Sequence, residues 1–196
     1  MHSTQTAIRI LRTPFSNLWF SQAMGFSKIR RLISLMVAGT VLTALGSAAL
    51  AVEEGETAPA FALPSIYEDQ PGISMEGLQG KVVYVDFWAS WCAPCLKSLP
   101  LYNDMYHKYK DQGLEVVAIN VDNPIEDGLD FLIDTPLDFL IPSDPDGETA
   151  ELFEVIGMPT SYLINAEGQV ELVHMGFRDG DMAIIEQAIQ AALAAN

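Results

Sequence analysis

The fold is decided by one stretch, Val82–Pro100, which reads VVYVDFWASWCAPCLKSLP. Its first part is a short run of β-branched and aromatic residues, which is typical of a strand buried on both faces. Its second part holds Cys92 and Cys95 around Pro94, and proline is favoured in the first turn of a helix. The pattern predicts a strand, a turn and a helix. It places the Cys92 sulfur at the helix N-terminus, where unpaired N–H groups and the helix dipole stabilise a thiolate.

The first 51 residues have the pattern of an export signal. Lys28, Arg30 and Arg31 precede the apolar run Leu32–Leu45, and small residues follow at Ala49-Leu50-Ala51. We predict an N-terminal extension and signal peptide over residues 1–51, cleaved after Ala51, and one domain over residues 52–196. This prediction places the domain outside the cytoplasm, in the periplasm.

Two alternatives remain open at this end of the chain. Leu32–Val52 is just long enough to span a membrane, so a second hypothesis keeps it as an uncleaved inner-membrane anchor. The start of translation is also open between Met1 and Met24, because the 23 residues before Met24 are more than the basic segment before the apolar run of a signal peptide needs.

Charge is distributed very unevenly along the chain. Five of the ten Lys and Arg residues precede Leu32, whereas all 26 Asp and Glu residues follow Ala51, so the domain carries a formal charge of −21. Such a surface repels nucleic acid and anionic lipid. Nucleic acid is therefore excluded as a partner, and contact with a membrane is expected only through the possible N-terminal anchor.

Cys92 and Cys95 are the only cysteines, and an exported pair can form a disulfide. As a structural bridge the pair is a poor choice, because so short a loop removes little entropy from the unfolded chain. A domain of this size also buries enough surface to fold without a crosslink. The spacing therefore favours a redox-active dithiol over a structural disulfide.

The remaining segments alternate between strand and helix patterns, which predicts an α/β sheet. Two short strands are expected around a turn at Gln70–Gly72. The elements expected after the first helix are a strand over 114–121, a helix over 124–135 with Ile125, Leu129, Leu132 and Ile133 inward, an edge strand over 139–142, a helix over 148–155, a hairpin over 161–176 and a helix over 181–195.

Two motifs, WCAPC at 91–95 and GMPTSYLI at 157–164, resemble those of the thioredoxin superfamily. The N-terminal addition and the long connection between Val121 and Glu148 are similar to the TlpA/ResA-type branch of extracytoplasmic thiol–disulfide oxidoreductases. The resemblance covers residues 58–195. It implies a thioredoxin fold, a mixed β-sheet flanked by helices, with an N-terminal β-hairpin and a central helix–strand insertion.

Dithiol exchange needs an exposed thiolate that attacks and a second thiol that resolves the mixed disulfide. We predict Cys92 as the nucleophile, because it lies nearer to solvent, and Cys95 as the resolving residue. The resemblance further implies that the Met158–Pro159 bond is cis and lies against the cysteines. Trp91, Met158 and Pro159 are then the expected substrate-binding residues.

Asp86 is an acidic residue in a run that otherwise indicates complete burial. Thioredoxins carry an aspartate at this place below the inner cysteine, whereas TlpA/ResA proteins more often have a glutamate at the position of Ser98. The lysine that thioredoxin places nearby is replaced by Ala118. Without that partner, desolvation is expected to raise the pKa of Asp86 and make it a proton acceptor for Cys95.

The resemblance implies an enzyme that reduces disulfides in exported proteins, by analogy those of cytochrome c or copper-site biogenesis. An upstream membrane electron donor is expected, and no cofactor beyond the Cys92–Cys95 disulfide. Two alternatives stay open: an oxidant that donates disulfides, and a copper-chaperone-like domain that binds metal through the cysteines and a histidine. No metal ligand set is predicted, because only His107 and His174 follow Ala51 and no third ligand adjoins the pair.

Overall fold

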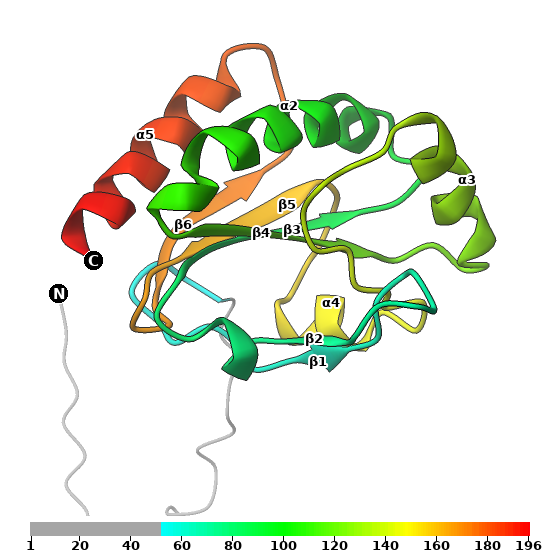
Figure 1. Ribbon diagram of the computed structural model, residues 1–196, viewed down its shortest axis with the longest axis horizontal. Helices are drawn as coiled ribbons and strands as arrows, with labels where there is room; N and C mark the ends of the chain where they lie inside the picture. Colours follow the sequence, from blue (N-terminus) through cyan, green and yellow to red (C-terminus); the bar gives the residue numbers. More distant parts are fainter. Residues whose placement is uncertain (1–51) are drawn as a thin grey trace, which may run out of the picture. The chain divides into compact units, whose positions relative to one another are not determined.

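The computed structural model describes residues 52–196 (Figure 1). The predicted signal peptide, its cleavage after Ala51 and the alternative anchor lie outside these residues. Among the helices of residues 52–196, none is both long and apolar enough to cross a membrane.

A four-stranded mixed sheet forms the centre of the domain, with strand order β4-β3-β5-β6. The strands are β3 (Val82–Trp88), β4 (Leu114–Asn120), β5 (Thr160–Ile164) and β6 (Val170–Met175). β3 runs parallel to β4 and antiparallel to β5, and β6 pairs antiparallel with β5. Beyond β4, residues 140–143 pair in parallel through two isolated bridges, Val117 with Leu140 and Asn120 with Ser143. The predicted edge strand is therefore present as an irregular pairing.

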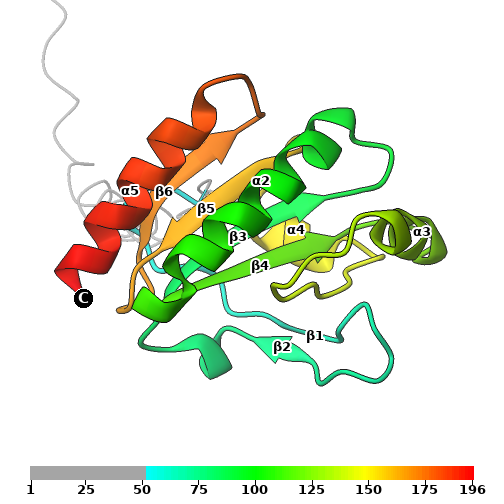
Figure 2. The ribbon, with the colours of Figure 1, turned by 45° about the horizontal axis from the view of Figure 1, so that its top comes forward.

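Helices cover one face of the sheet, and a hairpin with a short helix covers the other (Figures 1 and 2). The first face carries α2 (Ala93–Tyr109) and α5 (Asp181–Ala195), and α3 (Glu126–Asp134) lies beyond the β4 edge. The second face carries β1 (Ala62–Leu63), β2 (Ile73–Ser74) and α4 (Glu148–Leu152). Short 3-10 turns, η1 (Glu76–Leu78) and η2 (Lys110–Gln112), precede β3 and β4.

Alternating side chains of β3 enter two separate apolar clusters, so the strand is buried along its whole length. Tyr84 and Trp88 pack beneath α2 and α5, whereas Val83, Val85 and Phe87 pack toward the hairpin and α4. Asp86 lies on the same side of β3 as Tyr84 and Trp88, because side chains two residues apart share one face of a strand. The carboxyl is thus directed to the helical layer that holds the cysteines.

The predicted thioredoxin fold with its N-terminal hairpin is confirmed, and one detail of α3 is wrong. Leu132 is buried, but Ile133 is 77% exposed rather than inward. The two neighbours lie about 100° apart around a helix axis. A helix that packs through one stripe on a sheet edge therefore covers only one of them.

Candidate active site

Cys92 and Cys95 form a disulfide at the start of α2, with their Cα atoms 5.3 Å apart. Cys92 is the N-cap residue of the helix, and Pro94 lies within its first turn. The exposed fraction is 5% for Cys92 and 0% for Cys95. Cys92 is therefore the more accessible of two buried cysteines, and Cys95 faces the core.

A buried carboxylate holds the turn that leads into the cysteines. Asp122 accepts hydrogen bonds from the Ser90 backbone N–H at 2.9 Å and from the Ser90 hydroxyl at 2.8 Å. The Asn120 side-chain amide donates to the same carboxylate at 2.7 Å, and the Val121 N–H donates to the Trp88 carbonyl at 3.0 Å. The ends of β3 and β4 are thereby joined below Cys92. The sequence analysis missed this clamp.

The Met158–Pro159 peptide bond is cis. Thr160 donates its hydroxyl to the Gly157 carbonyl at 2.6 Å, and the Gly176 N–H donates to the Pro159 carbonyl at 2.8 Å. These contacts hold the loop before β5 in place. Within residues 52–196, the backbone N–H and C=O of Met158 make no hydrogen bond, so they are available to a partner chain.

Asp86 is fully buried and has one polar partner. The Ser161 hydroxyl donates to Oδ1 of Asp86 at 2.6 Å, whereas Oδ2 has no partner among the described residues. Its neighbours in register are Ala118 on β4 and Ser161 on β5. Desolvation raises the pKa of Asp86 to about 7, and the Ser161 hydrogen bond opposes part of this rise. The pKa changes in the direction that the sequence predicts.

Two buried tyrosines, Tyr84 and Tyr102, lie near enough to Asp86 for its charge to act on their phenols. Tyr84 and Tyr102 meet edge to face with ring centroids 5.2 Å apart. Burial raises the pKa of both phenols, and the Asp86 carboxylate adds to the rise. Tyr102 lies two helical turns after Cys95, and between them Ser98 donates its hydroxyl to the Cys95 carbonyl at 3.0 Å. The buried face of α2 that carries Cys95 therefore also carries Tyr102, whose phenol lies near Asp86.

Neither of the two histidines in residues 52–196 is a partner of the cysteines. His107 Nε2 lies 2.8 Å from Asp138, and His174 Nε2 lies 3.2 Å from Asp181. Within the part of the chain that the structure describes, no three His, Cys, Asp or Glu side chains converge into a metal-binding group.

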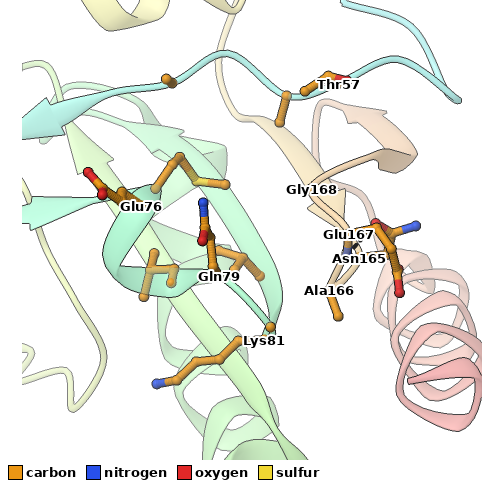
Figure 3. A pocket seen from close by; sticks show the side chains of 14 residues that line it. Thr57, Glu76, Gln79, Lys81, Asn165, Ala166, Glu167 and Gly168 are labelled. Atoms are coloured by element: carbon orange, nitrogen blue, oxygen red, sulfur yellow. Dashed lines mark hydrogen bonds between the residues drawn. The ribbon is translucent and has the colours of Figure 1, made fainter.

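A hollow of about 690 Å³ lies at the opposite end of β3 from the disulfide. Figure 3 shows the β5–β6 turn on one side of it, Glu76 and Gln79 on the other, and Thr57 above. Lys81, at its edge, forms an ion pair of 2.7 Å with Glu115. None of the residues that line it is a cysteine or histidine, so it is separate from the dithiol.

Comparison with known proteins agrees with this geometry. The chain matches the AhpC/TSA family over residues 55–173. The thiol-disulfide oxidoreductase ResA of Oceanobacillus iheyensis is 37% identical over 124 residues, which are 62% of this chain and 65% of that protein. ResA of Bacillus subtilis is 34% identical over 139 residues, which are 70% of this chain and 75% of that protein.

Among solved structures, the domain is similar to a Chlorobium tepidum protein described as a thiol:disulfide interchange protein DsbE. The two are 45% identical, with a TM-score of 0.70 over 73% of this chain and 99% of the other. The fold and the dithiol thus define a thiol–disulfide oxidoreductase with a thioredoxin fold. The chain belongs to the AhpC/TSA family, and its similarity to ResA places it among the oxidoreductases of that family.

Proposed function

We propose that this enzyme reduces disulfides in exported proteins by dithiol exchange through Cys92 and Cys95. One observation carries the proposal. Cys92 is 5% exposed and stands at a helix N-terminus, whereas Cys95 is fully buried on the core-facing side of α2. This asymmetry suits one attacking and one resolving sulfur.

In the first step, the Cys92 thiolate attacks one sulfur of a partner disulfide. The partner S–S bond breaks, a mixed disulfide forms, and the second partner sulfur leaves as a thiolate that takes a proton from solvent. The helix N-terminus favours this step because it lowers the free energy of the attacking thiolate.

In the second step, the Cys95 thiol gives its proton to Asp86 and its sulfur attacks Cys92. The bond between Cys92 and the partner breaks, and the Cys92–Cys95 disulfide forms as in the structure. The partner sulfur released from Cys92 leaves as a thiolate and takes a proton from solvent, and Asp86 later releases the proton of Cys95. The partner thus gains two electrons from the dithiol and two protons from solvent. A carboxyl with a pKa of about 7 suits this transfer, because it accepts and returns a proton near neutral pH.

The partner chain is expected to bind beside Trp91 and the cis-proline loop. Its backbone can pair with the free N–H and C=O of Met158 as an added strand. Pro159 is buried behind that loop, so its role is to present the Met158 backbone to the partner. Trp91 is 69% exposed and offers an apolar surface next to Cys92.

The compartment in which the reaction takes place is inferred from residues 1–51, which lie outside the described part of the chain. We infer export through the signal peptide over residues 1–51, with cleavage after Ala51, to the periplasm. A membrane electron donor must then return the disulfide to the dithiol. By analogy with the TlpA/ResA-type oxidoreductases, the substrates are exported proteins that are to receive haem or copper. N-terminal sequencing of the exported protein tests the cleavage: Val52 is the expected first residue, and an intact N-terminus supports the anchor instead.

Trapping of mixed disulfides tests the assigned roles. Reduced Cys95→Ser protein, mixed with disulfide-bonded insulin, should form a one-to-one adduct that dithiothreitol removes, because the second step is blocked. Cys92→Ser protein should form none, and the double variant is the matched control. Adducts formed by Cys92→Ser and not by Cys95→Ser would reverse the two roles.

A further inference from the structure

An apolar hollow of about 470 Å³ adjoins the disulfide on the side of α4. We call it the Trp91 groove. Its apolar lining comes from four separate segments of the chain: Trp91, Val121, Ala150, Val155, Ile156 and Met158. Trp91 immediately precedes Cys92 in the chain, and Met158 immediately precedes the cis proline. The groove is therefore continuous with the place where a partner disulfide must dock.

Two of the most exposed large apolar side chains in residues 52–196 line this groove. Trp91 is 69% exposed and Ile156 is 89% exposed. Single exposed apolar residues are common on protein surfaces, but a pair that lines one concave site beside a reactive group is typical of a binding site. The groove therefore suits an apolar side chain of a partner.

The charged side chains that line the Trp91 groove or lie on the adjacent α4 are acidic. Between Asp111 and Phe177 the chain contains fifteen Asp and Glu residues and no Lys or Arg. Asp146 lines the groove itself, and Glu148 and Glu151 are exposed on the adjacent α4. Lys97, the nearest basic residue to the dithiol along α2, is paired with Asp179. A negative potential at this site attracts a basic segment and repels an acidic one.

We propose that the Trp91 groove selects partners whose disulfide lies in an extended segment that combines an apolar residue with Lys or Arg. The apolar side chain fits between Trp91 and Ile156, and the basic side chains lie near Asp146 and α4. This inference rests on the proposed exchange activity and adds to it the class of substrate.

Three probe disulfides with the same reacting bond separate three effects on the exchange rate. These are the effect of peptide charge, the effect of an apolar side chain and the intrinsic reactivity of the dithiol. Each has one Cys joined by a disulfide to thionitrobenzoate, whose release is coloured. Two are ten-residue peptides with a Leu beside the Cys and either three Lys or three Glu, and the third is N-acetylcysteinamide. The reduced enzyme should react at least tenfold faster with the Lys peptide than with the Glu peptide at about 10 mM salt. The ratio should fall toward one near 0.5 M salt, because salt screens exposed charges.

Variants then test the groove directly. Ile156→Ser should lower the rate for the Lys peptide, relative to the small probe, about tenfold, which corresponds to the lost burial of one apolar side chain. Asp146→Asn should lower the preference for Lys over Glu about threefold. Ile133→Ser is the matched control: its side chain is 77% exposed on α3, outside the groove, and it should change neither ratio.

The outcomes distinguish this inference from the proposed function. Equal rates for the Lys and Glu peptides at low salt, or an effect of Ile156→Ser no larger than that of Ile133→Ser, would overturn the groove and leave the exchange activity standing. Absence of thionitrobenzoate release from the small probe with wild-type protein would overturn the exchange activity, and the groove inference with it.

Discussion

Ser161 on β5 donates its hydroxyl to the carboxyl of Asp86 on β3 at 2.6 Å. The two residues are direct neighbours in register. This hydrogen bond is the single polar contact of the Asp86 carboxyl within the described part of the chain. Burial raises the pKa of Asp86, and this hydrogen bond lowers it. The pKa of this buried carboxyl therefore depends on one serine on the neighbouring strand.

Ser161→Ala should raise the pKa of Asp86 above about 7, because the ionised carboxyl loses the one hydrogen-bond donor it has among residues 52–196. A hydrogen bond to a charged group contributes roughly 1.5–3 kcal/mol, or about one to two pH units. If ionised Asp86 accepts the Cys95 proton, the acid limb of the pH–rate profile for disulfide exchange should move up by that amount.

The matched control for this change is Ser143→Ala. Ser143 is also buried, and its hydroxyl has no partner among residues 52–196, so its removal should leave the acid limb in place. An acid limb that does not move in Ser161→Ala would separate Asp86 from the proton transfer.

Asp86→Asn should stabilise the oxidised protein at neutral pH. Asp86 has a pKa of about 7 in the folded protein and an ordinary value of 3.8, so folding favours the protonated form. The resulting loss of stability is absent below about pH 4, grows between about pH 4 and 7, and is constant above that. The difference corresponds to at most roughly 4 kcal/mol. Urea midpoints of wild type and variant should coincide in acid and separate at neutral pH.

Asp138→Asn provides a control of opposite sign. The His107 hydrogen bond lowers the pKa of Asp138, so this carboxylate stabilises the fold above its unfolded pKa, and that effect disappears as pH falls through its folded pKa. Its replacement should not stabilise the protein at neutral pH. If Asp86→Asn also proves destabilising at pH 7, Asp86 is a satisfied structural acid whose ionised form the fold stabilises.

Gly128→Ala should destabilise the protein even though alanine is the better helix former. A Cβ at Gly128 would lie 2.7 Å from Nδ2 and 2.9 Å from Oδ1 of Asn120. Asn120 holds Asp122, which in turn holds Ser90 in the turn before Cys92. Crowding in a packed core typically costs about 1–3 kcal/mol.

Gly77→Ala is the matched control for Gly128→Ala, because its Cβ would meet only the Ser74 hydroxyl oxygen at an ordinary 3.5 Å. Urea unfolding compares the two variants. A Gly128→Ala protein as stable as wild type would show that Asn120 moves aside without cost.

Local patterns predicted the parts of the site that lie close together in sequence. The strand, the turn and the helix over Val82–Pro100 follow from composition and from Pro94, and they place Cys92 at the N-terminus of α2 and Cys95 in its first turn. The raised pKa of Asp86 also follows, because burial on both faces of β3 could be inferred from the apolar run around it. These inferences need only the order of residues along one segment.

Contacts between distant segments could not be predicted in the same way. Ser161 is 75 residues from Asp86, and their pairing depends on the strand order of the sheet. The Ser90–Asp122 clamp and the Trp91 groove likewise join segments from different strands and loops. The one sequence signal for the clamp was Asp122, an acidic residue directly after the strand predicted over 114–121.

The equilibrium reduction potential of the Cys92–Cys95 couple tests the proposed reductase activity most directly. Purified protein is equilibrated in glutathione or dithiothreitol buffers of known potential, free thiols are alkylated, and the oxidised fraction is measured by mass spectrometry. Thioredoxin lies near about −270 mV and the oxidant DsbA near about −120 mV. A disulfide reductase should give about −250 mV or lower, whereas a value near about −120 mV would contradict the account and identify a donor of disulfides.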